Sequence, residues 1–477
     1  MLEHLQPQAV FHWFEALCAS PHGSGNTRAV ADWCVSFARE RGLACRRDEH
    51  DNVVIRKPAS PGYESAPALI LQGHLDMVCE KDPGCGKDMT REGLDLRCDG
   101  NWVWADGTTL GGDDGIAVAM ALAILDDGSL PHPALEVLIT ADEEIGMLGA
   151  EGLDASDLAG RRLLNLDSES EGIFTVGCAG GNRTHCVLPL QREPWEGGTW
   201  RLTVSGLRGG HSGECIDRGR ANASMLLGRL LSEVARQTEL RLILARGGLK
   251  DNAIPALAEA QVAVPAGTEL SDIAAAFGAQ LRHEYRAADP DVTVTAVPCE
   301  PDFLPMDKDS TAHCLCLLAC APNGVQEMSR DVPGLPQTSL NLGILTTVED
   351  AMEASFCLRS SIASQKEMMR RRLETLTEAL GGHTEVSGDY PAWEYRAESP
   401  LRDLMAEIYR EQYSAEPRIE VIHAGLECGL LSGKLPGLDC VSIGPDMEDI
   451  HTPRERMSIP SVQRIWAFVT EVLRRAR

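Results

Sequence analysis

Short apolar runs in this chain repeatedly lead to a histidine or a carboxylate. The runs at residues 68–71, 135–140 and 163–166 are each followed shortly by such a residue. This pattern is typical of a buried strand that brings a polar side chain to the edge of a sheet. It therefore predicts a buried sheet with ionisable groups at one edge. The residues in these and similar positions are His74, Asp76, Asp113, Glu143, Glu144, Asp167 and, far downstream, His451.

Helical patterns alternate with these strands. Gly-Ser-Gly-Asn26 precedes an apolar-periodic run at residues 29–38, which Gly42 closes, and residues 116–125 have a similar character. A capping residue before such a run and a glycine after it are the usual signals of a helix. Strands that alternate with helices predict an α/β sheet, in which ligands gather at the strand ends.

The pattern changes near residues 193–198. Beyond this point strand-like and helical runs predict an α+β insert of about two hundred residues, within the usual size of a domain. Two similar halves would fit this alternation, although no sequence repeat is evident. The strand-like runs lie at 200–204, 240–245, 292–297, 339–345 and 354–358, and the helical runs at 222–236, 270–285 and 365–380.

The first pattern resumes at residue 390. A helix is expected at residues 401–413, strands at 419–422 and 440–443, and a closing helix from Ser461. His451 would then belong to the same domain as the early strand ends. We therefore predict one domain made of residues 1–192 and 390–477, split by an inserted domain at residues 193–389.

Composition excludes several classes of protein. Of the 477 residues, 44 are Lys or Arg and 71 are Asp or Glu, so the net charge is -27. Binding to nucleic acid is not expected, because phosphate contacts need clustered basic residues. No apolar stretch approaches the about 20 residues that span a bilayer, and no signal peptide is evident at the N-terminus. Sixteen cysteines without a C-x-x-C pair fit a reducing compartment, so we expect a cytoplasmic protein with no membrane partner.

Two motifs place a candidate metal ligand beside a residue that would orient it. His74 and Asp76 point to the same side of an extended strand end, so the carboxylate could hold the imidazole while its other nitrogen binds a metal. Asp113 and Asp114 follow a glycine-rich turn that opens a helix. Helix capping would explain these two carboxylates equally well. In the functional interpretation Asp113 bridges two cations and Asp114 sets the turn.

Three consecutive carboxylates, Asp142 to Glu144, follow the strand at residues 135–140. A solvated loop is one explanation; the alternative is that Glu144 binds a metal while Glu143 acts as general base on water. Asp167 ends another strand, and His451 lies in a proline-flanked loop where a structural histidine is also common. Together these oxygen and nitrogen donors suit zinc, manganese or cobalt, with two ions about 3.5–4 Å apart.

These residues lie in motifs that resemble one family along essentially the whole chain. The family is that of the co-catalytic zinc metallopeptidases, which include glutamate carboxypeptidases, peptidase T and carnosinases, and the chain looks most like its aminoacyl-histidine dipeptidase (Xaa-His dipeptidase) branch. The residues after His451, Thr-Pro-Arg-Glu-Arg-Met457, are more basic than is usual there. The matching motifs are Gln72-Gly-His-Leu-Asp-Met-Val-Cys-Glu-Lys81, Gly111-Gly-Asp-Asp-Gly-Ile116, Ala141-Asp-Glu-Glu-Ile-Gly146, Asn165-Leu-Asp-Ser-Glu169, Gly209-Gly-His-Ser-Gly213, His423-Ala-Gly-Leu-Glu-Cys-Gly429 and Ser442-Ile-Gly-Pro445.

The resemblance implies a mixed-sheet α/β zinc-peptidase catalytic domain split by an inserted α+β lid domain. It implies two divalent metal ions, Zn²⁺ before Mn²⁺ or Co²⁺. His74 and Asp167 would hold one ion, Glu144 and His451 the other, and Asp113 would bridge them.

The same resemblance assigns the other catalytic roles. Glu143 matches the general base and Asp76 the aspartate that orients the histidine ligand. The peptide bond between Asp113 and Asp114 is expected to be cis. In the lid, His211 matches a histidine that stabilises the tetrahedral oxyanion, often across a dimer, although a turn histidine between glycines is the simpler structural interpretation.

Four further residues are candidate substrate contacts. Arg359 matches a site for the C-terminal carboxylate of the substrate, which suits a guanidinium fork. Asn252 and Asn222 match contacts in the lid. Glu427 would face the substrate amine or support the site.

The activity implied is that of a metallo-dipeptidase on unblocked dipeptides, including Xaa-His and β-alanyl-histidine. An N-acyl amino acid deacylase or a tripeptidase of the same fold is the alternative. An inactive binding protein would be expected to have lost Glu143 or a ligand, and none is lost. A homodimer is implied by the resemblance alone.

Overall fold

The computed structural model describes residues 1–477, whose contacts divide the chain into two compact units. Unit 1 comprises Met1–Cys178, Tyr395–Val421 and Leu426–Arg477, and unit 2 comprises Ala179–Glu394 and Ile422–Gly425. Unit 2 is therefore an insert in the sequence of unit 1. The domain boundaries expected at residues 193 and 390 stay predictions.

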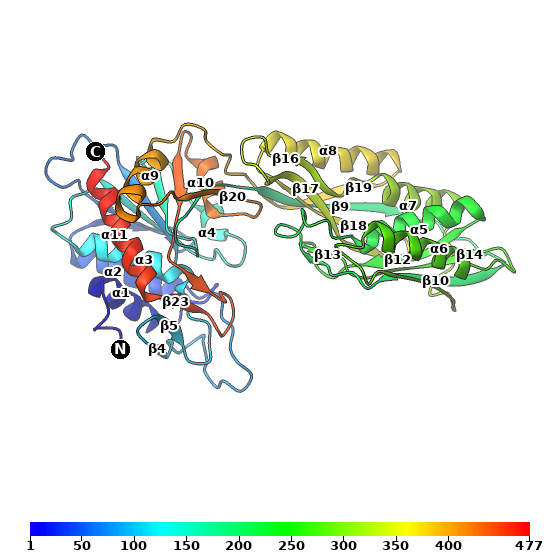
Figure 1. The fold of residues 1–477 in the computed structure, drawn as a ribbon, viewed down its shortest axis with the longest axis horizontal. Coiled ribbons are helices and arrows are strands. Elements are labelled where there is room, and N and C mark those ends of the chain that lie inside the picture. The colour runs from blue at the N-terminus through cyan, green and yellow to red at the C-terminus, as the bar shows by residue number, and fades with distance from the viewer. The chain divides into compact units, whose positions relative to one another are not determined.

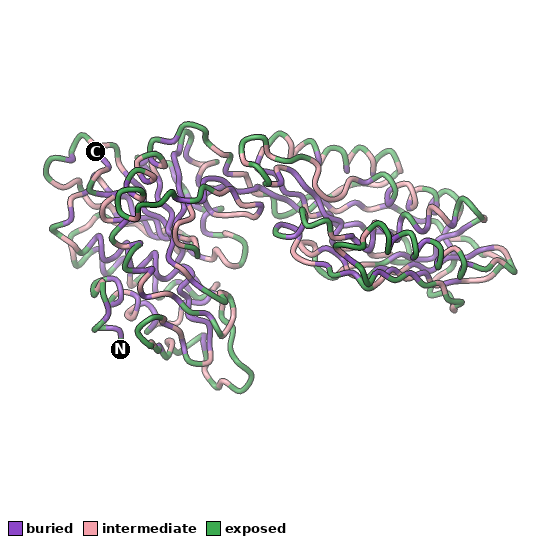
Figure 2. The backbone as a smooth tube through the Cα atoms, viewed as in Figure 1, coloured by how far each residue is buried: buried purple, intermediate pink, exposed green.

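Unit 1 is built around an eight-stranded sheet with the order β1-β2-β6-β3-β7-β21-β8-β20. β3 (Leu69–His74) pairs in parallel with β6 (Leu135–Thr140) and with β7 (Arg162–Asn165), and β7 pairs in parallel with β21 (Asp439–Ser442). Every residue of β3, β6 and β21 is buried, as the apolar runs predicted (Figure 2). Because these four strands run in parallel, their carboxyl ends meet at one edge of the sheet.

The remaining elements of unit 1 surround this sheet or form a small second sheet (Figure 1). The helices are α1 (Gln8–Cys18), α2 (Arg28–Glu40), α3 (Gly112–Asp126), α4 (Leu148–Gly152), α9 (Pro400–Tyr413), α10 (Glu427–Lys434) and α11 (Ile459–Arg475). The outer strands of the main sheet are β1 (Ala44–Arg47), β2 (Val53–Lys57), β8 (Ile173–Cys178) and β20 (Arg418–Ile422). The small sheet has the order β22 (Met447–Glu448), β23 (Arg456–Ser458), β5 (Trp102–Ala105) and β4 (Leu96–Cys98).

Helix α3 lies in the core of unit 1, against α1 and β3. All its residues from Gly112 to Leu125 are buried, which explains why its sequence is apolar on every side. A Cβ atom on Gly73 in β3 would lie 2.5 Å from the Cβ of Ala117. Glycine at position 73 therefore lets α3 pack closely against the strand that ends at His74.

Unit 2 contains a nine-stranded sheet, in which two four-stranded halves have the same topology and the ninth strand, β16, pairs with β17. The first half runs β10-α5-β12-β14-α6-β15 with the spatial order β15-β10-β14-β12, and the second runs β9-α7-β17-β18-α8-β19 with the order β17-β18-β9-β19. Both are βαββαβ units with antiparallel pairing. They join through β12 and β17, so the insert does consist of two similar halves.

The bounds of the unit 2 elements agree with every strand and helix predicted there. The strands are β9 (Gly180–Pro189), β10 (Gly198–Ser205), β11 (Gly210–His211), β12 (Arg241–Gly247), β13 (Ala253–Ile254), β14 (Ala258–Val264), β15 (Thr293–Pro298), β16 (Gly324–Met328), β17 (Pro336–Thr347), β18 (Ala351–Ser360) and β19 (His383–Tyr390). The helices are α5 (Ala223–Gln237), α6 (Ser271–Glu284), α7 (Lys308–Cys320) and α8 (Ala363–Ala379). The expected α/β fold class is confirmed. None of the helices in either unit is long and apolar enough to cross a membrane.

Burial predicts how leucine substitutions in unit 2 affect stability. Leu340 is fully buried in β17, so Leu340→Ala should lower the free energy of unfolding by about 2–5 kcal/mol, through lost burial and a residual cavity. Leu249, which is 95% exposed, is the matched control, and Leu249→Ala should change stability by less than about 0.5 kcal/mol. Urea-induced unfolding measures both, and equal effects would contradict this packing.

Candidate functional site

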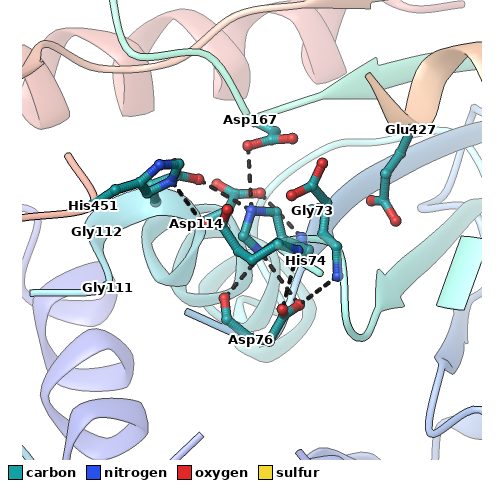
Figure 3. A network of polar contacts seen from close by, with 12 residues as sticks. Gly73, His74, Asp76, Gly111, Gly112, Asp114, Asp167, Glu427 and His451 are labelled. Carbon is teal, nitrogen blue, oxygen red and sulfur yellow. Dashed lines mark hydrogen bonds and ion pairs between the residues drawn. The ribbon is translucent and has the colours of Figure 1, made fainter. Parts of the chain in front are cut away.

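The carboxyl edge of the unit 1 sheet brings together the ionisable residues predicted from sequence. His74 is the last residue of β3, Glu143 and Glu144 lie in the turn after β6, and Asp167 follows β7. In Figure 3 the side chains of His74, Asp167 and His451 belong to one network of polar contacts. The parallel pairing of β3 with both neighbours is what places these segments side by side.

Asp113 is shared by two pairs of side chains. Its Oδ1 lies 3.0 Å from Nε2 of His74, and its Oδ2 lies 3.1 Å from Nε2 of His451. Each imidazole nitrogen also faces a second carboxylate, since Asp167 Oδ1 lies 3.5 Å from His74 Nε2 and Glu144 Oε1 lies 2.8 Å from His451 Nε2. The arrangement consists of two histidine–carboxylate pairs joined by one carboxylate, which is the geometry of a bridged two-ion site.

The cluster has an excess of negative charge that draws protons onto its imidazoles. The carboxylates of Asp113 and Glu144 beside its Nε2 stabilise the protonated ring and raise the pKa of His451 to about 10. Burial lowers the pKa of His74, but Asp167 and Asp113 outweigh this effect and hold it well above its usual value. Burial raises the pKa of Asp167 to about 7. Positive charge is therefore strongly favoured here.

The donor set fits divalent metal ions. Oε1 of Glu144 is buried and makes no hydrogen bond, although Nε2 of His451 lies 2.8 Å away. Two groups, His74 with Asp113 and Glu144, and His74 with Asp114 and Asp167, present donor atoms within 4.8 Å of one another. Nitrogen and oxygen donors without a thiolate suit zinc, manganese or cobalt.

Asp76 and Asp114 hold the histidine and the turns around it. Nδ1 of His74 lies 2.9 Å from the backbone carbonyl of Asp76, which leaves Nε2 facing the cluster. The carboxylate of Asp76 accepts hydrogen bonds from the backbone N–H groups of Glu143 and Glu144 at 2.9 and 3.2 Å. Asp114 accepts one from the backbone N–H of His74 at 3.1 Å, and the peptide bond before it is cis, as expected. Asp114 thus ties the turn of Asp113 to β3.

Glu143 and Glu427 are carboxylates whose protonated form is favoured by burial. Burial, with the charges of Asp167 and Glu427, raises the pKa of Glu143 well above its usual value. Glu427 is fully buried, and its Oε2 accepts hydrogen bonds from Nε2 of Gln72 at 2.7 Å and from Oγ1 of Thr140 at 2.6 Å. Its Oε1 is buried without a hydrogen bond, and burial raises its pKa to about 7.

In unit 2, His211 presents one ring nitrogen as an acceptor. The backbone N–H groups of Gly213 and Glu214 point to its Nδ1 at 3.3 and 3.4 Å. Burial and the nearby guanidinium of Arg359 lower its pKa, which favours the neutral ring. With Nδ1 accepting, this hydrogen-bond pattern assigns the proton to Nε2, which is then available as a donor.

Arg359 lies near the end of β18 with two polar groups beside it. Its Nη1 donates to the hydroxyl of Tyr390 at 3.3 Å, and its Nε is buried without a hydrogen bond. Ser339 is the residue opposite it on β17, and the Oγ of Ser339 lies 2.7 Å from Nε2 of His423. Nδ1 of His423 is also buried without a partner. A guanidinium with an unsatisfied Nε, beside a histidine with an unsatisfied Nδ1, is a candidate carboxylate site.

Asn222 and Asn252, the two asparagines expected to contact the substrate, have different surroundings. The side-chain oxygen of Asn222 caps α5 by accepting from Ser224 and Met225, and its Nδ2 donates to Asn341 and Leu342. Its hydrogen bonds are thus used within unit 2, and its substrate contact stays a prediction. Asn252 lies in the loop before β13, where its carbonyl accepts from the backbone N–H of Ser212 at 2.8 Å.

Three residues in these networks had not been assigned a role from sequence. Ser24 donates to Asp76 at 2.7 Å, His423 lies beside Arg359, and Glu455 accepts from the turn that carries Asp113. His423 stands in a motif already matched to the family. Ser24 and Glu455 are ordinary turn and loop residues in sequence, and only the folded chain brings them to the site.

The chain belongs to peptidase family M20/M25/M40, whose model matches residues 70–475. It is 39% identical over 477 residues to the cytosol non-specific dipeptidase of Escherichia coli (strain K12), covering 99% of this chain and 98% of that protein. The crystal structure of aminoacylhistidine dipeptidase from Vibrio alginolyticus has a TM-score of 0.94 and 38% identity, covering 99% of this chain and 97% of that one. The family predicted from the motifs is therefore confirmed.

More distant structures share the fold. Aminopeptidase PepT from Bacillus cereus ATCC 10987 has a TM-score of 0.57 and 14% identity, covering 99% of each chain. A tripeptidase from Staphylococcus aureus has a TM-score of 0.57 and 16% identity over the same share. At these identities the likeness extends to the arrangement of strands and helices.

Protonation of His423 should make stability depend on pH. Burial and Arg359 lower its pKa to about 3 in the folded chain, against about 6.5 when unfolded. Below pH 6.5 only the unfolded state takes up this proton, so the free energy of unfolding falls by up to about 1.4 kcal/mol per pH unit as the pH decreases towards 3. His423→Asn should remove this slope and exposed His383→Asn should not, as urea unfolding between pH 7.5 and 4.5 would show. Parallel pH curves for wild type and His423→Asn would contradict the assignment.

Proposed function

We propose that this chain is a metal-dependent dipeptidase that hydrolyses unblocked dipeptides, including Xaa-His and β-alanyl-histidine. The observation that carries the proposal is the position of Asp113, whose two oxygens each face a histidine–carboxylate pair. The full-length likeness to two dipeptidases, at 39% and 38% identity, supports the same activity.

The proposed cofactors are two divalent ions, with zinc first and manganese or cobalt as alternatives. His74 and Asp167 would hold one ion, Glu144 and His451 the other, and Asp113 both. When bound, such ions polarise the scissile carbonyl and lower the pKa of the attacking water. The donor atoms of His74, Asp113 and Glu144, which all lie within 4.8 Å of one another, support this assignment.

Glu143 is the proposed general base and acid. Its carboxylate takes a proton from water as the water oxygen bonds to the carbonyl carbon, and then gives this proton to the nitrogen as the C–N bond breaks. A raised pKa suits this return of the proton, and the bond from its backbone N–H to Asp76 fixes the turn that carries it. Asp76 is proposed to orient both this turn and His74.

Five residues are proposed to recognise the substrate. His211, with its proton on Nε2, donates to the oxyanion of the tetrahedral intermediate. Arg359 binds the C-terminal carboxylate, which would use its free guanidinium donors. Glu427 meets the free amine, for which its unpartnered Oε1 is a suitable acceptor. Asn252 and Asn222 are kept as further contacts to the peptide.

The proposal also includes a cytoplasmic location and a homodimer. The similar E. coli protein is named as cytosolic, and no disulfide bond joins any of the sixteen cysteines here, which suits a reducing compartment. The homodimer rests on the family resemblance, and light scattering on the purified protein measures it.

The test is hydrolysis measured together with metal content on the same preparation. Alanyl-histidine, β-alanyl-histidine, a dipeptide without histidine, a tripeptide and an N-acetylated dipeptide are compared. Cleavage of the free dipeptides, abolished by a chelator and restored by zinc, manganese or cobalt, is expected. Cleavage of the acetylated compound alone would move the assignment to a deacylase, and of the tripeptide alone to a tripeptidase.

Glu143→Gln should lower kcat for alanyl-histidine by about 10²–10⁴-fold, the range for a lost general base, and leave the metal content unchanged. Steady-state kinetics and elemental analysis measure the two effects. Glu151, an exposed carboxylate in α4, gives the control Glu151→Gln, which should retain full activity. A Glu143→Gln variant with wild-type turnover would refute the assignment.

Arg359→Lys should raise KM for free dipeptides by about 10–100-fold, because a bidentate charged contact of about 1.5–3 kcal/mol is reduced to a single one. The same dipeptides with a C-terminal amide serve as control, since they lack the carboxylate and should be cleaved equally by wild type and variant. An unchanged KM for the free dipeptides would exclude the carboxylate contact.

A further inference from the structure

Glu455 accepts hydrogen bonds from the backbone of four consecutive residues in the turn that carries Asp113. Its Oε2 lies 2.8 Å from the N of Leu110 and 3.1 Å from that of Gly111. Its Oε1 lies 2.8 Å from the N of Gly112 and 3.5 Å from that of Asp113. The Glu455 residue is 2% exposed, so these bonds are made away from water. Both oxygens of one buried carboxylate are thus occupied by a single turn.

This turn has no acceptor of its own for these groups. It opens helix α3, and the first N–H groups of a helix lack partners within the helix. The N-cap residue of α3 is Gly111, which has no side chain to cap the helix. Asp113 and Asp114 have non-helical dihedral angles. Glu455 therefore supplies the missing acceptor, and its negative charge is favourable at a helix N-terminus.

Two glycines let the carboxylate approach the turn. Gly111 has a φ of +65°, which other residues rarely adopt. A Cβ atom on Gly112 would lie 3.3 Å from Oε1 of Glu455 and 3.0 Å from Sδ of Met447. The glycine pair that precedes Asp113 is thus matched to a carboxylate that comes from the far end of the sequence.

Glu455 also belongs to the loop that carries His451. Its backbone N–H donates to the carbonyl of Thr452 at 3.0 Å, and Oγ1 of Thr452 donates to the carbonyl of Asp449 at 2.7 Å. These bonds make residues 449–455 a compact turn. The His451 side chain is 44% exposed, so little packing holds it in place.

We infer that Glu455 is a positioning residue that fixes His451 relative to Asp113. The carboxylate of Glu455 accepts hydrogen bonds from the N–H groups of the Asp113 turn. Its backbone N–H closes the loop that carries His451. The inference rests on the proposed function in taking Asp113 and His451 as ligands of one metal centre.

Hydrogen–deuterium exchange on the metal-free wild-type protein tests the hydrogen bonds between Glu455 and the Asp113 turn by themselves. The amides of Leu110, Gly111 and Gly112 should exchange as slowly as those inside α3, because each is buried and bonded to Glu455. Exchange as fast as in exposed loops would overturn the inference. This measurement needs neither bound metal nor activity.

Glu455→Gln then tests the link to the metal centre. Glutamine keeps the volume but offers one acceptor oxygen in place of two and turns an N–H₂ group towards backbone donors. Zinc affinity of the metal-free protein, measured by titration calorimetry, should fall at least tenfold, and protection of the 110–113 amides should be lost. The control is Glu448→Gln, which removes an exposed ion pair with Arg456 nearby and should change neither. A folded Glu455→Gln variant with wild-type zinc affinity would overturn the inference.

Failure of the inference about Glu455 can be distinguished from failure of the proposed function. Wild-type protein that bound no divalent metal would refute the proposed function, whereas the exchange measurement would still decide whether Glu455 holds the turn. Metal binding with full activity in Glu455→Gln would refute the positioning role and leave the dipeptidase intact.

Discussion

Repulsion between buried carboxylates is the constraint on which the functional end of unit 1 depends. Three parallel strands bring Asp167, Glu144 and the residues around His74 to one edge, and α3 adds Asp113. Carboxylates this close cannot all be ionised away from water unless positive charge lies among them. The raised pKa values of both histidines express this demand. The folded chain by itself therefore gives this site an affinity for cations.

A framework of hydrogen bonds from backbone N–H groups holds the cluster in place. Asp76 accepts from the turn of Glu143, Asp114 accepts from β3, and Glu455 accepts from the turn of Asp113. Each of these carboxylates accepts at least one hydrogen bond from a backbone N–H group and so fixes a segment. Of the three, only Asp114 has an acidic neighbour in the sequence, Asp113, whose two oxygens face His74 and His451. These two adjacent acidic residues therefore have different tasks, one structural and one chemical.

Much of this arrangement could be predicted from sequence because its signals are local. Apolar runs that lead to His74, Asp167 and the Glu143 turn define strands whose ends meet, and the motifs around them specify the family. Helix α7 and strand β14 were missed, because α7 has a weak amphipathic pattern and β14 is buried along almost its whole length without clear alternation. Glu455 was missed for another reason, since its partners lie more than three hundred residues away. The identical topology of the two halves of unit 2 is likewise visible only in strand order.

The central claim is that five side chains of unit 1 hold two divalent ions on one shared carboxylate. The most direct measurement is the number of zinc ions bound per chain, by native mass spectrometry of metal-free protein titrated with zinc, for wild type and for Asp113→Ala. Two ions per chain in the wild type, with binding of both weakened in the variant, is the predicted result. A single ion per chain, or two ions whose affinities do not respond to loss of Asp113, would contradict it.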